Sequence, residues 1–138
     1  AFALYRAHLN AGGVAVLNVV GSHLDAEQRP ALEAVVATAR EVFSSVDVYP
    51  DPWEPDDYPT RNIFIAASDQ PRIVPRQAGK PGDADRLSQA LARSEPIAVE
   101  TGRVLTDDAA PLEVLVRRTT EILRSRAREY LPVRVLIE

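Results

Sequence analysis

The clearest apolar pattern in the chain runs from Val14 to Val20, where Asn18 is the only one of seven residues that is not apolar. A strand with one wet face alternates apolar and polar residues. A near-continuous apolar run is instead typical of a parallel sheet covered by helices on both faces. The pattern therefore predicts a buried strand in a parallel sheet. In such sheets ligands bind beyond the carboxyl ends of the strands, which here means the segment from Asn18 to Asp25.

Helical and strand-like patterns alternate in the first half of the chain. Apolar residues at helical spacing predict a short helix over residues 2–9 and a second helix that follows Asp25 and ends near residues 43–45. Asp25 and Gln28 have the spacing of a capping box at the start of this second helix. Short apolar runs predict two further strands, over residues 46–49 and 63–67.

Residues 1–70 are therefore expected to form one α/β unit, and residues 71–138 a mainly helical extension that packs on the same domain. The stretch 70–83 is rich in proline, glycine and charge, and is interpreted as an exposed crossover or a subdomain boundary. The extension is expected to hold a helix that ends near Arg93, another that begins near Ala110, and a closing edge strand over residues 133–137.

Composition narrows the classes of function. The chain has 138 residues, of which 46% are hydrophobic, enough for one domain with a core. A net charge of -4 gives no drive toward nucleic acid or anionic membranes. No apolar run approaches the roughly 20 residues that span a bilayer. The absence of cysteine suits a reducing compartment. We therefore expect a cytoplasmic protein that binds neither nucleic acid nor membrane through this segment.

Methionine is also absent, so Ala1 is not an initiator residue. A buried parallel strand needs earlier strands to pair with, yet only one short helical segment precedes Val14. Together these observations predict that an amino-terminal half is missing from the chain.

A proline-rich loop over residues 50–59 separates the two later strands, and it carries the aromatic residues Trp53 and Tyr58. Its acidic side chains focus negative potential, and aromatic ring faces attract cations, which together suit an organic amine. The alternative is that the acids are solvated and the two rings only anchor the loop. The acidic residues of the loop are Asp51, Glu54, Asp56 and Asp57.

Four further sets of polar residues are candidates for chemistry. Asn18 either faces a ligand crevice or caps the turn after its strand. Asp107 and Asp108 are either paired carboxylates for acid–base or metal chemistry, or caps of the following helix. His8 and His23 form neither a triad nor a recognisable metal site. Arginines and glutamates alternate on the last helix, which favours a solvated face over phosphate contact. No phosphate-binding glycine loop is present, and the chain shows no complete active site. We expect no catalytic, cofactor-binding or metal-binding residue in it.

Several segments resemble spermidine synthase-like polyamine aminopropyltransferases, which have the class I methyltransferase fold. The resemblance rests on the segments Gly12–Asn18, Glu41–Phe43, Tyr58-Pro59-Thr60-Arg61, 62–67 and 104–113. It covers about residues 1–70, with a weaker echo at 104–113. It implies the carboxyl half of a Rossmann-like domain, with a mainly parallel sheet flanked by helices.

The resemblance also implies a substrate site. Asn18 takes the place of a glutamine that faces the amine, and Tyr58 that of a substrate-contacting tyrosine. Thr60 and Arg61 depart from the serine and glycine that the family has after this tyrosine. The family's cofactor loop, ribose-binding acid and catalytic aspartate would all precede residue 1.

The implied reaction transfers an aminopropyl group from decarboxylated S-adenosylmethionine to an amine such as putrescine. The chain is then an inactive fragment whose partner is the missing amino-terminal half or another copy of itself, and we expect a homo-oligomer. Two alternatives remain open. One is an S-adenosylmethionine-dependent methyltransferase-fold relative. The other is a non-catalytic interaction module that completes its sheet by self-association.

Overall fold

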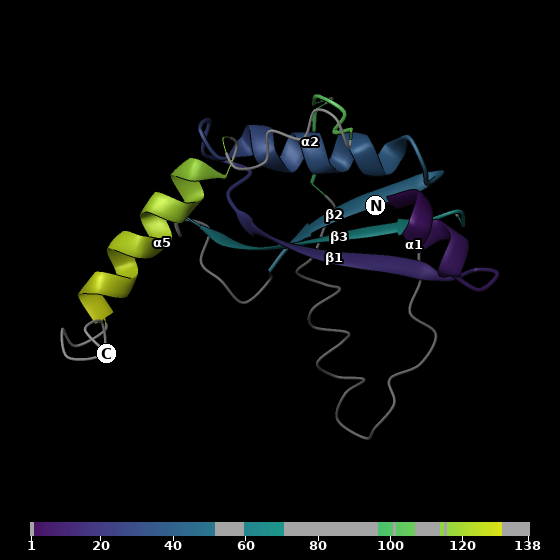
Figure 1. The fold of residues 1–138 in the computed structure, drawn as a ribbon, viewed down its shortest axis with the longest axis horizontal. Coiled ribbons are helices and arrows are strands. Elements are labelled where there is room, and N and C mark those ends of the chain that lie inside the picture. Colours follow the sequence, from purple (N-terminus) through teal and green to yellow (C-terminus); the bar gives the residue numbers. More distant parts are fainter. Residues whose placement is uncertain are drawn as a thin grey trace, which may run out of the picture.

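The computed structural model describes residues 2–51, 60–70, 97–100, 102–106, 114 and 116–130. Along the chain these form the elements shown in Figure 1: α1 (Phe2–His8), β1 (Val14–Gly21), α2 (Arg29–Arg40), β2 (Ser45–Pro50), β3 (Arg61–Ser68) and α5 (Arg117–Tyr130). The expected first helix, amphipathic second helix and three strands are confirmed. The second helix ends at Arg40, a few residues earlier than its apolar stripe predicts.

The three strands form one open sheet in the order β1-β3-β2, and both pairings are antiparallel. The expectation of a mainly parallel sheet is therefore wrong for the described strands. Because β1 and β2 are each antiparallel to β3, they run in the same direction. They do not pair, since β3 lies between them.

The chain path explains this arrangement. α2 carries the chain back to the starting end of the sheet, as a crossover between strands of the same direction must. The connection from Asp51 to Thr60 then reverses the chain, so β3 enters antiparallel and fills the gap. Periodicity identifies each strand, but it does not report which strand becomes the neighbour of which.

The apolar run of β1 misled because it is apolar on both faces, whereas the two faces are buried to different degrees in the described structure. Leu17 and Val19 pack toward α2. Val16 and Val20 lie on the other face, with exposed fractions of 65% and 40%. α2 is the helix that contacts all three strands in the described part of the chain.

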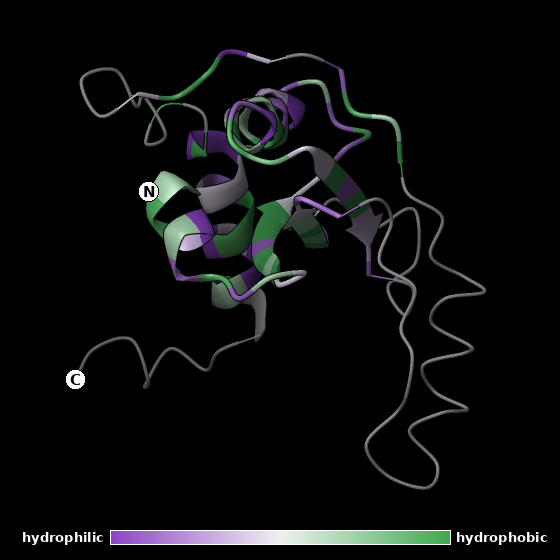
Figure 2. Cartoon of the chain, turned by 90° about the vertical axis from the view of Figure 1, so that its right-hand side faces the viewer, coloured by the Kyte–Doolittle hydropathy of each residue, from purple (hydrophilic) through white to green (hydrophobic). Residues whose placement is uncertain are grey.

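The core lies between α2 and one face of the sheet. The amphipathic stripe of α2 supplies the buried Leu32 and Val36, which meet the central strand residues. Figure 2 views α2 nearly end-on above strands that are mostly apolar. The buried strand residues of this cluster are Val48, Ile63 and Ile65.

The turn between α1 and β1 has the backbone that its glycines predict. Gly12 has a φ of +75°, which L side chains rarely adopt, so glycine ends the helix at low cost. The amide of Gly13 donates to the carbonyl O of Asn10 at 2.8 Å. A Cβ at Gly13 would lie 2.9 Å from that same oxygen, so neither position accepts a larger residue without a shift of the backbone.

Residues 97–106, where described, cross β2 and α2. The amide of Ile97 donates to the carbonyl O of Val48 on the outer edge of β2 at 2.9 Å. Further along, the amide of Leu105 donates to Oγ1 of Thr38 at 2.8 Å. A Cβ on Gly102 would come within 2.4 Å of the α2 backbone at Glu33. This crossing therefore covers the β2 edge and fits closely against the helix.

Other expectations fall outside the described residues: the helix ending near Arg93, the helix start near Ala110 and the strand over 133–137. The division at residue 70 stays a prediction. None of the helices described here is long and apolar enough to cross a membrane.

Candidate functional site

Two strands end at the same edge of the sheet. β1 ends at Gly21 and β2 at Pro50, and β3 begins there with Arg61, the register partner of Gly21. α5 lies at this end of the sheet (Figure 1). This carboxyl edge is where the sequence predicts ligand binding.

Buried polar side chains gather at the carboxyl edge. Among the described residues every buried polar side chain except Ser68 belongs to this group, and Arg61 is only 4% exposed. Because burying a polar group without a hydrogen bond is costly, such side chains need partners. The group consists of Ser22, Gln28, Thr60, Arg61 and Thr119.

The hydrogen bonds of this group hold elements together. Oγ1 of Thr119 donates to Oε1 of Gln28 at 3.1 Å, which ties α5 to the start of α2. Nη2 of Arg61 donates to the carbonyl O of Asp51 at 3.4 Å. We interpret the buried polar group as a structural element that stabilises the carboxyl edge, since each of these hydrogen bonds joins two segments of the fold.

The turn after β1 is held by Ser22 and Asp25. Oγ of Ser22 accepts from the amides of Leu24 at 3.2 Å and Asp25 at 3.1 Å. Oδ1 of Asp25 accepts from the amides of Glu27 at 2.8 Å and Gln28 at 3.1 Å, so Asp25 caps the turn that leads into α2. The N-cap of α2 itself is Gln28, which makes no side-chain cap hydrogen bond, so the predicted capping box is confirmed only in part. The hydrogen bond from the Glu27 amide, with smaller contributions from Gln28 and Arg118, holds the pKa of Asp25 below its usual 3.8.

The lowered pKa of Asp25 predicts a loss of stability in acid. A carboxylate whose pKa is lower in the folded state stabilises the fold fully above its unfolded pKa, and that contribution disappears as the pH falls through the folded pKa. We expect Asp25→Ala to lower the free energy of unfolding by about 1 kcal/mol at pH 7, as other capping losses do. The difference from wild type should shrink progressively below about pH 4, measured by urea unfolding.

Asp47→Ala provides the matched control, because it also removes one carboxylate but no hydrogen bond to a backbone amide is recorded for Asp47 in the described structure. A deficit of Asp25→Ala that stays constant down to pH 2 would contradict the capping role of the ionised carboxylate.

The second feature of the site is the sheet face that α2 does not cover, which we call the open face. Alternation along the strands assigns its side chains. Register places Tyr49, Phe64 and Asn18 side by side across the three strands, and Asp47 lies in the next row opposite Ala66. The open face consists of Val16, Asn18, Val20, Asp47, Tyr49, Asn62, Phe64 and Ala66.

Asn18 lies on the open face, three residues before the end of β1, and is exposed. Its Nδ2 donates to Oδ1 of Asn62 at 3.0 Å. The turn after the strand is capped by Ser22 and not by Asn18. The bond to Asn62 fixes the amide of Asn18 and leaves its Oδ1 able to accept a further donor. A role of Asn18 in substrate binding stays a prediction.

Tyr58, the other predicted substrate residue, lies outside the described residues, as do Trp53, Asp107 and Asp108. Sequence reasoning missed Asn62, the hydrogen-bond partner of Asn18, and it missed the neighbours Tyr49 and Phe64. Alternation in 45–50 and 61–68 holds the signal, but it becomes readable only once the pairing of β3 with both other strands is known.

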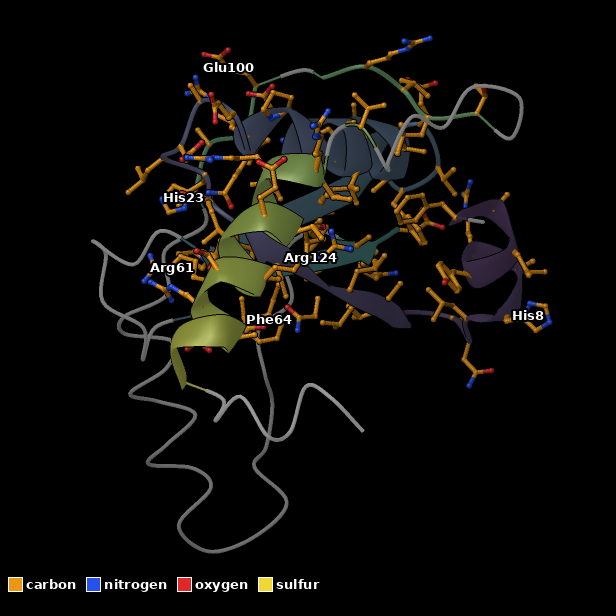
Figure 3. The ribbon with its side chains drawn as sticks, turned by 60° about the vertical axis from the view of Figure 1, so that its left-hand side comes forward. His8, His23, Arg61, Phe64, Glu100 and Arg124 are labelled. Atoms are coloured by element: carbon orange, nitrogen blue, oxygen red, sulfur yellow. The ribbon has the colours of Figure 1, made fainter. Side chains whose placement is uncertain are left out.

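The two histidines lie at opposite ends of the molecule (Figure 3). Nδ1 of His8 donates to the carbonyl O of Leu4, one helical turn earlier, at 2.8 Å. His23 lies near the carboxyl edge with Arg61 (Figure 3). The two therefore form no catalytic pair. The described residues contain no cluster of three His, Cys, Asp or Glu side chains that would hold a metal ion.

Comparisons of this chain with protein-family models, with curated proteins and with solved structures found no match.

Proposed function

We propose that this chain is the amine-binding carboxyl part of a spermidine synthase-like aminopropyltransferase. The observation that carries the proposal is the row of Asn18, Phe64 and Tyr49 on the open face, with Asp47 in the next row. These side chains lie close to the end of the sheet where β1 and β2 finish.

The chemistry of this row suits an alkyl amine. An ammonium group is recognised by carboxylates, by amide oxygens and by aromatic ring faces. Asp47 supplies the carboxylate, Asn18 an amide oxygen, and Tyr49 and Phe64 the rings. An alkyl chain between two amine groups would lie against the apolar parts of the same face.

The chain path supports the fold that this function requires. β1 and β2 run in the same direction, connected through α2, and their carboxyl ends meet at one edge. We propose that this is the carboxyl half of a Rossmann-like methyltransferase-fold domain, in which β3 is an antiparallel member of the sheet. Such mixed sheets are common among doubly wound folds. The acidic, aromatic loop that contains Tyr58 follows the end of β2 and thus leaves from the same edge.

In the proposed reaction the nitrogen lone pair of the amine attacks the aminopropyl carbon of decarboxylated S-adenosylmethionine. A C–N bond forms as the C–S bond breaks, so that methylthioadenosine leaves and the ammonium proton passes to a base. The residues of this chain bind and orient the amine, which gives the reaction its proximity advantage. The base and the cofactor site belong to polypeptide outside residues 1–138. A cytoplasmic location follows from the small-molecule substrates together with the absence of cysteine.

The decisive experiment is a product analysis of the protein as its gene encodes it. Decarboxylated S-adenosylmethionine and putrescine are supplied together, and a parallel reaction contains S-adenosylmethionine as the donor. Methylthioadenosine, spermidine and S-adenosylhomocysteine are measured. We expect both products in equal amounts. If only S-adenosylmethionine is consumed, with release of S-adenosylhomocysteine, the protein is a methyltransferase relative and the proposal is wrong. If neither cofactor is consumed, the enzymatic interpretation fails altogether.

A further inference from the structure

The two edges of the sheet differ in how they are protected. Proteins usually protect an edge strand with charges, proline, a bulge or a covering segment, since unpaired amides and carbonyls attract another strand. The outer edge of β2 has all but the bulge: Asp47 and Pro50 lie in the strand, and Ile97 donates to Val48 from a covering segment.

The outer edge of β1 has none of these protections. Its eight residues, Val14–Gly21, include no charged residue and no proline. No described segment pairs with that edge, because the only strand bonded to β1 is β3. β1 is thus an edge strand of eight uncharged residues whose outer edge is unpaired in the described structure.

A groove runs along this unprotected edge. It has a volume of about 500 Å³ and is lined by Tyr5 and His8 of α1, by Leu9 directly after α1, and by residues 15–18 of β1. The lining includes β1 residues from both faces of the sheet, so the groove follows the edge itself. Two residues that line it are exposed, Tyr5 to 48% and Val16 to 65%. An extended strand fits such a groove, since β1 supplies backbone hydrogen bonds and α1 supplies apolar contact.

We propose that the occupant is β1 of a second copy, paired antiparallel about a two-fold axis perpendicular to the sheet. Such an axis keeps α2 of both copies on the same side, so residues of the same face lie opposite each other. Because β1 carries no charge, the pairing brings no like charges together. A second β1 therefore provides hydrogen-bond partners for the outward-facing amides and carbonyls of β1 in both copies at once.

The position of Asn18 selects the register. With Asn18 opposite Asn18 of the second copy, Val16 lies opposite Val20, and Leu17 lies opposite Val19. Apolar residues then meet apolar residues, and amide meets amide. A shift of the partner strand by two residues in either direction would place Asn18 opposite a valine. Polar residues at such positions fix register in other assemblies.

The interface is small. Eight residues of strand are about 27 Å long. Together with the contacts of α1, this places the interface at the low end of specific interfaces, below about 1,200 Å². We therefore expect dimerisation that depends on concentration, with the mass rising from 15.1 kDa toward twice that value.

Light scattering of the 138-residue chain over a concentration series tests the association. Val16→Lys places a charge in the interface and should keep the chain monomeric. Leu24→Lys is the matched control, because Leu24 is equally exposed, at 64%, but lies in the turn beyond β1. This control should dimerise like wild type. A wild-type chain that stays monomeric into the high micromolar range overturns the proposal, and so does loss of the dimer in the Leu24 variant alone.

Cysteine cross-linking tests the register, and the chain has no native cysteine to interfere. Residues opposite each other in an antiparallel pair have Cα atoms about 4.5–5.5 Å apart, within the range of a disulfide. Under mild oxidation Asn18→Cys should form a covalent dimer quickly. Val16→Cys should do so only when mixed with Val20→Cys. Cross-linking of Asn18→Cys no faster than that of Leu24→Cys would disprove this pairing.

The inference concerns the 138-residue chain, and the proposed function predicts a different occupant of the β1 edge in the complete protein. A strand from the polypeptide that carries the cofactor site would compete for the same edge of β1. When both chains are purified together, a complex of the two different chains would then replace the homodimer. That outcome overturns the second copy as the occupant in the complete protein, while the product analysis above still decides the reaction.

Discussion

Replacing Ile65 with alanine is expected to lower the free energy of unfolding by about 2–5 kcal/mol, the usual range for a large apolar side chain removed from a core. Ile65 is fully buried, and it lies on the central strand between its register partners Leu17 and Val48. α2 packs on the same face, so the neighbouring side chains have little freedom to close the cavity. Urea or thermal unfolding of the purified variant measures the change.

Phe64→Ala is the matched control, because it removes a larger side chain from the adjacent position on the same strand. Phe64 lies on the open face and is only partly buried. We expect Phe64→Ala to cost less than Ile65→Ala, although phenylalanine buried in a core costs more than isoleucine. Equal or greater loss at Phe64 would mean that both faces of the sheet are covered, and the one-sided architecture would be wrong.

The sequence predicts the individual elements well because each has a strong local signal. The stripe that includes Leu32 and Val36 repeats at helical spacing and is buried as expected. Gly12 marks the end of α1 with its positive φ. Asp25 caps the turn before α2, close to the position that its spacing to Gln28 predicts, since side-chain capping depends only on neighbours in the chain.

Strand adjacency is not predictable in the same way. The apolar run of β1 has the composition of a strand buried on both faces, yet Val16 on its outer face is largely exposed. Burial depends on what packs from elsewhere, which a strand's own sequence does not specify. The insertion of β3 between β1 and β2 is a property of the chain path and leaves no periodic signal.

The candidate site shows the same limit. Asn18 is conspicuous in sequence because it is the one polar residue of an apolar run. Its partner Asn62 is 44 residues away, and the two meet only because β3 pairs with β1. Arg61 was expected only as a departure from a glycine, and its burial depends on the packing of the carboxyl edge. Interactions between distant segments are therefore what the structure adds.

Asn18→Leu in the protein as its gene encodes it is expected to raise the apparent KM for putrescine by about ten- to a hundredfold. A hydrogen bond to a charged group contributes about 1.5–3 kcal/mol, and each 1.4 kcal/mol is a factor of ten in affinity. Leucine has nearly the same size as asparagine and no hydrogen-bonding group. The turnover number should change much less, because the amide of Asn18 would bind the amine without taking part in the breaking C–S bond. Steady-state kinetics with varied putrescine measure both constants.

Asn18→Gln keeps the amide and should retain most of the affinity, whereas Tyr58→Ala should raise the KM for the amine as Asn18→Leu does. Val16→Leu, an apolar change on the same face, controls for general disturbance of the sheet. If Asn18→Leu and Val16→Leu leave the KM equally unchanged, Asn18 does not contact the amine. If instead the KM for decarboxylated S-adenosylmethionine rises while that for putrescine stays constant, the open face binds the aminopropyl donor. The assignment of the amine to the row of Asn18, Phe64 and Tyr49 would then be wrong, even in an active transferase.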